Sequence, residues 1–319
     1  MAKFIGRRLL AMVFVLWAVA TFTYFMVHVT PGDTATAILI ETYGEEVVSP
    51  ETLQAVREKF DLERPLVQQY ADWLVNAVTG NFGISYRYNL PVGQMLAMRL
   101  PNTLELGIAS LIIALVIAVP LGVLSALKHN RIPDHLVRLV VLLLASFPGF
   151  WLAIMGIMLF SIQLGWLPTS GKGGFESLIL PACTLSVGMI ASTTRMMRTS
   201  TLDVVRQDYM TVARVKGLTR GAVMRSHGIR NVIPPIITLV GLQIGHILGG
   251  AVVIESICAW PGVGDLFINA VNSKDTPMIE GCVILIAFGY AFANLLVDII
   301  YAWIDPRVKY SNAESGGAA

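Results

Sequence analysis

Charged side chains are scarce in this chain of 319 residues, because Asp, Glu, Lys and Arg make up only 14% of it. A soluble domain carries roughly 25% charged residues. Hydrophobic residues reach 55% here, and the mean hydropathy is +0.67. This balance excludes an ordinary soluble protein and indicates that much of the surface faces lipid. The net charge of +2 does not argue for nucleic acid, and we expect none as a partner.

The sequence also lacks a disulfide framework and the common catalytic motifs. Its three cysteines, Cys183, Cys258 and Cys282, are far apart and odd in number, so we interpret them as small buried apolar residues. No GxxxxGK(S/T) sequence is present, and we therefore do not expect this chain to hydrolyse ATP itself. HExxH, GxSxG and paired-aspartate motifs are absent as well, which predicts a protein that is not an enzyme.

Six long apolar stretches dominate the chain, and each is close to the ~20 residues that a helix needs to cross a bilayer. Runs this continuous favour helices, which satisfy their own backbone in lipid. The first run is too long for a signal peptide, so we expect a retained membrane anchor. The predicted fold is an all-α integral membrane protein. Its six predicted transmembrane helices lie at residues 9–30, 103–127, 136–163, 179–197, 233–257 and 279–303.

Basic residues are distributed unevenly about these six helices. If the N-terminus is cytoplasmic, 16 of the 23 Lys and Arg residues fall on the cytoplasmic side, which is the side that positive charge marks. We therefore predict that both termini are cytoplasmic. The predicted segments are an N-terminal end with the first helix (1–30), an extracytoplasmic insertion (31–100), a five-helix core (101–305) and a cytoplasmic tail (306–319).

Two connections are too long to be simple turns. Residues 31–100 predict two helices outside the membrane, the first of which is capped by Ser49 with Pro50 at its first position. They form a structural hairpin on the bundle or a docking surface for an external protein, and the two interpretations are compatible. The basic connection 198–232 predicts two short helical pieces, separated at Gly217, that present a surface to a cytosolic partner.

Small and polar residues interrupt the last two predicted helices. A stripe of glycines on the fifth helix allows close packing against another helix. This stripe consists of Gly241, Gly245 and Gly249. The neighbouring His246 is a hydrogen-bonded interior residue, a pore-lining residue or a weak candidate for metal contact. On the sixth helix, Asn294 and Asp298 lie one turn apart, and we expect Asp298 to pair with a neighbouring helix or to line the pathway.

The fifth helix ends in a turn that proline and glycine make rigid. Its tryptophan is of the residue type that anchors at a membrane interface. We predict that this turn is an outer gate or a docking edge. Its residues are Glu255, Trp260, Pro261, Gly262 and Gly264.

A series of short motifs follows in order along the chain. They are Arg7-Arg8, Pro31-Gly32-Asp33, Gly80 to Ser85, Leu100 to Leu106, Trp166-Leu167-Pro168, Ala213 to Leu218, Arg230-Asn231, Trp260 to Gly264, Asn294 to Asp298 and Asp305-Pro306-Arg307. With these motifs, the chain resembles over nearly its full length the permease subunits of bacterial peptide and nickel ABC importers. The resemblance implies the type I ABC importer permease fold in a bacterial cytoplasmic (inner) membrane.

The resemblance also implies that residues 209–235 form a coupling loop that fits into a groove of an ATPase subunit. The residues that it assigns to coupling are Tyr209, Thr211, Val212, Ala213, Arg214, Lys216, Gly217, Arg230 and Asn231. Importers in general have Glu-Ala-Ala where this chain has Thr211-Val212-Ala213, so a contact by that glutamate is not expected. The implied partners are a homologous second permease, two cytosolic ATPases that bind ATP and Mg²⁺, and an extracytoplasmic substrate-binding protein. No cofactor is expected in this chain.

The substrate is predicted from a finer resemblance. Gly249-Gly250, Glu255 and Ala259-Trp260 resemble the nickel branch of these permeases, and several methionines and His246 are residue types that contact soft metals. We therefore predict nickel or a metal chelate as the substrate, with a dipeptide or oligopeptide as the alternative. An ion-gradient-driven secondary transporter is an alternative of a different class, which would need more buried titratable residues and internal repeats.

Overall fold

The computed structural model describes residues 2–29, 35–36, 39, 49–59, 63–208, 210 and 229–304. Within these ranges the chain is helical, with one isolated bridge between Ile84 and Pro91 and no strand. The elements are α1 (Ala2–Val29), α3 (Pro50–Lys59), α4 (Leu66–Val78), α5 (Val92–Leu127), α6 (Ile132–Ser146), α7 (Gly149–Gly156), the π-helix η2 (Ile157–Gln163), α8 (Glu176–Val205), α11 (Ile229–Ile257), α12 (Val263–Asn272) and α13 (Thr276–Ile304).

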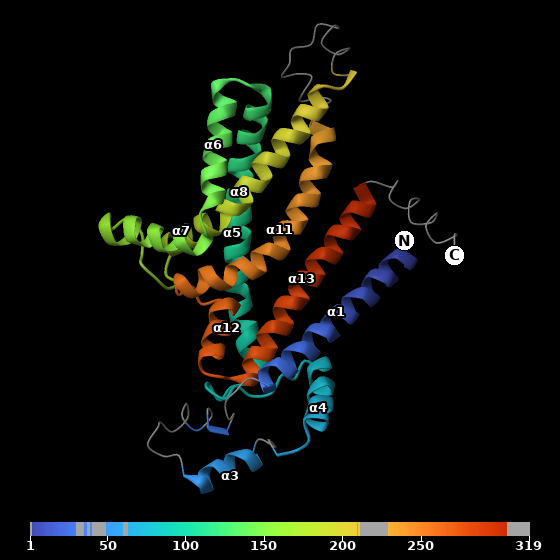
Figure 1. Cartoon of the computed structure of the whole chain (residues 1–319), viewed down its shortest axis with the longest axis vertical. Helices are drawn as coiled ribbons and strands as arrows, with labels where there is room; N and C mark the ends of the chain where they lie inside the picture. The colour runs from blue at the N-terminus through green and yellow to red at the C-terminus, as the bar shows by residue number, and fades with distance from the viewer. Residues whose placement is uncertain are drawn as a thin grey trace.

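The bundle is organised around α5, and its most extensive interface is with α8 (Figure 1). α6 returns beside α5, α11 packs on both α8 and α13, and α1 lies along α13 on the outside of the bundle (Figure 1). We call the end with the turn between α5 and α6 the Asn130 end. The opposite end, which holds α12 and lies nearest α3 and α4, is the α12 end.

The close contact between α5 and α8 depends on small residues. Ser110, Ala114, Ala118 and Gly122 follow one another at four-residue spacing on α5, and all four are buried. A Cβ atom at Gly122 would lie 2.6 Å from the Cβ of Met197 on α8, so a larger side chain has no room there. Small faces of this kind are how helices approach closely in lipid.

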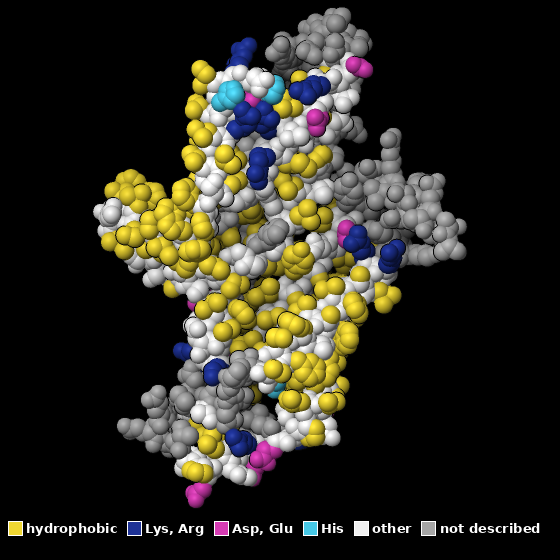
Figure 2. Space-filling model, viewed as in Figure 1, with side chains coloured by type: hydrophobic (Ala, Val, Ile, Leu, Met, Phe, Trp, Pro, Cys, Tyr) yellow, Lys and Arg dark blue, Asp and Glu magenta, His cyan; other side chains and the backbone are white. Residues whose placement is uncertain are grey.

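Among the described residues, four helices are long and apolar enough to cross a membrane on their own, and two bent pairs raise the number to six if each pair is one span. The four are α1 over Ile5–Val29, α5, α8 and α13 over Thr276–Ile300. The predicted class, an all-α integral membrane fold, is therefore confirmed. Hydrophobic side chains cover much of the visible surface between the two ends of the bundle, as lipid contact requires (Figure 2).

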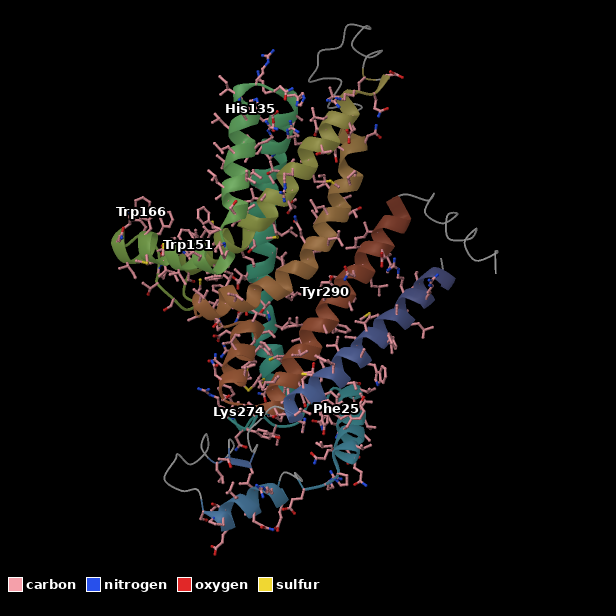
Figure 3. All side chains as sticks on the ribbon, in the orientation of Figure 1. Phe25, His135, Trp151, Trp166, Lys274 and Tyr290 are labelled. Carbon is pink, nitrogen blue, oxygen red and sulfur yellow. The ribbon has the colours of Figure 1, made fainter. Side chains whose placement is uncertain are left out.

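The prediction of one uninterrupted third helix over 136–163 is wrong. α6 ends at Ser146, and the following arm of α7 and η2 turns away by 94°. Pro148 accounts for the break, because proline donates no backbone hydrogen bond and disfavours a helical residue before it. Phe147 is accordingly extended, with ψ of 137°. The arm projects from the bundle and carries Trp151, while Trp166 follows its end (Figure 3).

Other helix boundaries also differ from prediction. α5 begins at Val92, so the last residues of the predicted insertion belong to a core helix. α8 runs to Val205 and takes up the start of the predicted connection 198–232. α11 bends by 48° between Pro235–Gly245 and Ile247–Ile257.

The two predicted helices of the insertion are confirmed as α3 and α4. α3 begins at Pro50, and the Ser49 hydroxyl accepts a hydrogen bond from the Thr52 amide (3.2 Å), which is the predicted N-cap. α4 rests on α1, because the hydroxyls of Tyr70 and Thr21 are 2.6 Å apart. The structural role of α4 is thereby visible, and a docking role for the insertion stays a prediction.

Candidate functional site

The bend between α6 and α7 leaves a groove against α8 and α11. A cavity of about 730 Å³ lies here, with lining residues from all four helices. A second cavity of about 560 Å³ lies between α6 and α8 toward the Asn130 end. Arg195 lines both cavities, so the two are neighbours, and we call them together the α6–α8–α11 groove.

Most of the groove wall is apolar. Its apolar side chains include Leu144, Phe147, Phe150, Leu152, Leu185, Leu239, Leu242, Val253 and Ile254. Gly188 leaves the backbone of α8 open to the groove, since a Cβ atom there would meet nothing within 4 Å. Only a few polar groups interrupt this wall, among them Thr184, Ser192 and Gln243. The groove wall therefore offers few specific polar contacts to a molecule that lies in it.

Gln243 of α11 is the most constrained polar group of the groove. Its side-chain Nε2 donates to the hydroxyls of Ser192 (2.8 Å) and Thr193 (2.9 Å) on α8. Its Oε1 is buried and accepts no hydrogen bond from the described residues. The amide joins α8 to α11 and leaves one strong acceptor without a partner, a costly arrangement unless something binds there.

Arg195 supplies the positive charge of the groove. It is exposed, and no carboxylate in the described part of the chain forms an ion pair with it. His135 and Arg138 line the same cavity from α6. Lys and Arg side chains gather near this Asn130 end of the visible face (Figure 2). The part of the groove nearest the Asn130 end therefore attracts anionic groups and repels free metal cations.

A buried carboxylate holds the groove together at the Asn130 end. Asp134 of α6 is fully buried and accepts hydrogen bonds from Arg198 Nε and Nη2 (both 2.8 Å), the Ser125 hydroxyl (2.5 Å) and the Asn130 amide (2.9 Å). The bidentate pairing with Arg198 joins α6 to α8, and Ser125 joins both to α5. Sequence reasoning missed this cluster because Asp134 and Arg198 lie 64 residues apart.

The turn after α11 is held by a second buried carboxylate. Glu255 is fully buried, and its Oε2 accepts hydrogen bonds from the amides of Gly264 (2.7 Å) and Asp265 (3.3 Å) at the start of α12. A Cβ atom at Gly262 would lie 2.2 Å from Glu255 Oε2, so this position requires glycine. Burial raises the pKa of Cys258 in this turn to about 11, which keeps the thiol protonated and unreactive.

Trp260 does not lie at a membrane interface as predicted. Its side chain is 1% exposed and packs with Leu106 of α5 and Leu178 of α8. Its indole Nε1 donates to the Asn102 carbonyl (2.9 Å), and the Asn102 side chain donates to the Pro261 carbonyl (2.7 Å). The turn is thus locked to α5, and its role as a gate or docking edge stays a prediction.

Comparison with known proteins identifies the family. A family described as "Binding-protein-dependent transport system inner membrane component" matches residues 118–310, more than half of the chain, and the model for the N-terminal part of such components matches residues 1–107. This chain belongs to that family of permeases.

Among curated relatives, the permease is 36% identical over 310 residues to the glutathione transport system permease protein GsiC of Escherichia coli strain K12 and of Shigella dysenteriae serotype 1. The match covers 97% of this chain and 100% of each relative. Inward-facing structures of the MetNI methionine ABC transporter share the fold, with TM-scores of 0.57 and 0.54 and 19% and 17% identity. Both cover 66% of this chain and 97% of theirs.

Membership settles the coarser predictions. The permease is an integral inner membrane protein with the type I ABC importer permease fold. It is a transport component, not an enzyme, and its family implies a partner permease, ATPase subunits and a substrate-binding protein. The nickel branch is not confirmed, because the relatives support the peptide-type alternative better.

The predicted glycine stripe of the permease packs within the chain. A Cβ atom at Gly241 would lie 2.1 Å from Val297 of α13, and one at Gly245 would lie 2.4 Å from Tyr290 (labelled in Figure 3). Gly249 is different, since no described residue lies within 4 Å of a Cβ atom there. Two of the three glycines therefore serve the α11–α13 interface.

Asp298 pairs with a neighbouring helix, as predicted. Its Oδ2 lies 3.0 Å from Nη1 of Arg8 on α1. Asn294 and Asp298 line a small cavity between α1 and α13, away from the α6–α8–α11 groove. The pair therefore joins two helices, and nothing places either residue on the groove wall.

Several predicted site residues lie outside the described residues. These are Tyr209, Thr211, Val212, Ala213, Arg214, Lys216 and Gly217, together with the side chains of Arg230 and His246. Arg230 and His246 are helical in backbone, and Asn231 is an exposed residue near the start of α11. In the described ranges, no group of three or more His, Cys, Asp or Glu side chains could hold a metal ion. Of the cysteines, Cys258 and Cys282 are buried as predicted, whereas Cys183 is exposed.

Proposed function

We propose that this permease imports glutathione-like or other short peptides, and that the α6–α8–α11 groove is its half of the translocation pathway. The full-length likeness to GsiC, at 36% identity, is the observation that carries the proposal. Nickel, a metal chelate and an ion-gradient-driven mechanism have no comparable support.

The charge of the groove supports a peptide over a free metal ion. Arg195 is an exposed cation with no carboxylate partner among the described residues, and it lines both cavities. Short peptides carry at least one carboxylate, which a guanidinium binds well. A divalent metal ion would meet repulsion at the same place.

The proposal also includes the orientation of the permease in the membrane and its contact with an ATPase subunit. Arg7, Lys128, Arg131 and Arg206 lie at helix ends that point toward the Asn130 end, so this end is proposed to face the cytoplasm. Residues 209–217 follow α8 in the sequence, and we propose that they contact an ATPase subunit. ATP and Mg²⁺ would bind to that subunit and not to the permease.

The test uses the complete transporter in proteoliposomes, with its second permease, ATPases and binding protein. We expect ATP-dependent uptake of labelled glutathione or a labelled dipeptide, and none of labelled nickel. Arg195→Gln should slow peptide uptake by at least tenfold, because a charge-assisted hydrogen bond contributes ~1.5–3 kcal/mol. Arg131→Gln removes a cation at the same end that lines neither cavity, and it should leave uptake unchanged.

Two results would contradict the proposal. Uptake of nickel without uptake of either peptide would overturn the substrate class. Equal peptide uptake by Arg195→Gln, Arg131→Gln and the unmodified transporter would remove Arg195 from the pathway.

A further inference from the structure

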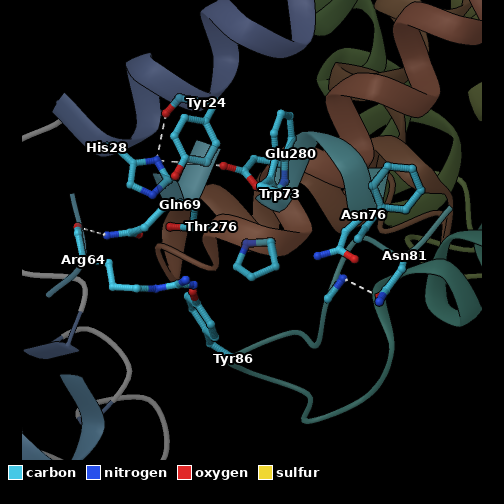
Figure 4. Close-up of a pocket in the computed structure, with 13 residues that line it drawn as sticks. Tyr24, His28, Arg64, Gln69, Trp73, Asn76, Asn81, Tyr86, Thr276 and Glu280 are labelled. Carbon is cyan, nitrogen blue, oxygen red and sulfur yellow. Dashed lines mark hydrogen bonds and ion pairs between the residues drawn. The ribbon is translucent and has the colours of Figure 1, made fainter. Parts of the chain in front are cut away.

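A separate cavity of about 240 Å³ lies at the α12 end, where the end of α1 meets α4 and the start of α13 (Figure 4). The loop between α4 and α5 closes it from another side with Asn81 and Tyr86. None of its lining residues lines the α6–α8–α11 groove. Its chemistry is therefore independent of the proposed pathway.

A buried carboxylate defines this cavity. Glu280, in the second turn of α13, is 2% exposed, yet its Oε1 accepts no hydrogen bond from the described residues. The nearest basic group is His28, with Nδ1 3.9 Å from that oxygen. Because His28 Nδ1 is also 2.8 Å from the Tyr24 carbonyl, it donates its hydrogen there and not to Glu280.

No Lys or Arg in the described part of the chain forms an ion pair with Glu280. Arg64 also lines the cavity, but its guanidinium pairs with Asp72 of α4 (3.0 Å). A buried carboxylate without a Lys or Arg counter-ion costs several kcal/mol, so a site of this kind is stabilised when a cation enters it.

Aromatic rings surround the carboxylate (Figure 4). Tyr24 and Trp73 have ring centroids 5.0 Å apart, Tyr24 stacks on His28 at 4.1 Å, and Tyr86 stands across the cavity. Ring faces attract cations, and this attraction is stronger where water is excluded. The side-chain amides of Asn76 and Asn81 add hydrogen-bond acceptors to the lining.

We propose that this cavity binds the primary ammonium group of a small molecule, with Glu280 as its counter-ion and the Tyr24–Trp73 wall as its cation–π contact. The unpartnered carboxylate oxygen and the amide oxygens suit a cation with several N–H donors better than a fully alkylated one. A metal ion does not fit, because no group of three metal-ligating side chains is present among the described residues. The ammonium group belongs to a small free amine or to the amino terminus of a short peptide.

The experiment measures binding to the complete transporter in nanodiscs by saturation-transfer NMR. The probes are n-butylammonium, tetramethylammonium, a dipeptide and its N-acetylated form. We expect saturable binding of butylammonium at least fivefold tighter than that of tetramethylammonium. Glu280→Gln should weaken it at least tenfold, whereas Glu176→Gln, which alters an exposed carboxylate at the start of α8, should not change it.

Trp73→Leu gives a second route if Glu280→Gln fails to assemble, and it should weaken butylammonium binding at least threefold. Binding of the free dipeptide but not the acetylated one, lost in these variants, assigns the peptide amino terminus as the source. Binding of butylammonium alone assigns small amines, and either result supports the cavity. The proposal is overturned if neither butylammonium nor the free dipeptide shows saturable binding. It is also overturned if Glu280→Gln, Trp73→Leu and the unmodified transporter bind these probes equally. Both outcomes hold whichever substrate the transporter carries.

Discussion

Replacement of Asp134 by alanine is expected to lower the free energy of unfolding of the permease by about 3–5 kcal/mol. The Asp134 carboxylate is fully buried and holds Arg198 by two hydrogen bonds of 2.8 Å. Its removal leaves the Arg198 guanidinium, whose side chain is only 17% exposed, without its counter-ion. Charge-assisted hydrogen bonds of this kind contribute ~1.5–3 kcal/mol each. The decrease in the free energy of unfolding that follows from losing this α6–α8 contact should therefore be large for a single substitution.

The measurement is an SDS-induced unfolding titration of the full chain in mixed micelles, read by tryptophan fluorescence. The double variant Asp134→Leu/Arg198→Met should recover at least half of the loss, because apolar residues of similar size replace buried ion pairs without great cost. Arg138→Gln is the matched control. Its guanidinium lies 3.9 Å from Asp134, and its side chain is 49% exposed, so we expect a loss within ~0.2–1 kcal/mol.

Two outcomes would refute this reasoning. One is a loss below about 1 kcal/mol for Asp134→Ala, which is the range of an exposed ion pair. The other is additivity of the two single substitutions in the double variant, because residues that form one buried network do not behave independently.

Two further predictions concern the glycine stripe and Tyr86. Gly245→Ala should destabilise the permease by about 1–3 kcal/mol in the same titration, since its Cβ atom would lie 2.4 Å from Tyr290, whereas Gly249→Ala should be tolerated. Equal effects of the two would contradict the packing. Burial, with the nearby carboxylates of Glu280 and Asp275, raises the pKa of Tyr86. Tyr86 thus stabilises the fold below pH ~10 and loses this contribution as pH rises further. The difference in free energy of unfolding between the unmodified permease and Tyr86→Phe should become smaller above pH ~10. Ionisation of Tyr86 at the pH of free tyrosine, detected by absorbance at 295 nm, would contradict this.

The membrane helices could be predicted because their signal is local. An apolar run of sufficient length forms a helix in lipid whatever it packs against. The Ser49 cap was predictable for the same reason, since Ser49 and Thr52 are three residues apart. The break at Pro148 had a local signal too, but the apolar residues on both sides made it look like one long span.

The residues that contact each buried carboxylate could not be predicted from the sequence. Asp134 meets Arg198, Glu280 meets Trp73 and His28, and each contact joins helices that are far apart in the sequence. An isolated acidic residue in an apolar run indicates that another group compensates its charge, but it does not identify that group. Glu255 was singled out as part of the turn, yet its bonds to the amides of the following helix depend on the path of the chain through Pro261 and Gly262.

Buried polar contacts at both ends of α5 restrict how the permease can change shape. At the α12 end, the Thr103 hydroxyl accepts from the Val263 amide (2.8 Å), and Asn102 is bonded to Trp260 and Pro261. At the Asn130 end, Asp134 joins α5, α6 and α8. Sliding of α5 along α8 would break the Asp134 contacts, and movement of α5 away from the turn between α11 and α12 would break those of Asn102 and Thr103. Access to the groove should therefore change by rotation of these joined helices as a rigid body.

Spin labels at Lys128→Cys, directly after α5, and Arg206→Cys, directly after α8, test this in a chain with Cys183→Ser, since both positions are exposed. Their distance should be the same, within the width of its distribution, in nucleotide-free and ATP-bound transporter. The distance from Lys128→Cys to an equivalent label on the second permease should change, because closing and opening of the groove then requires one unit to move against the other. An α5–α8 distance that changes as much as the distance between the permeases would show that the groove opens within the chain, and that the contacts of Asp134 break during the transport cycle.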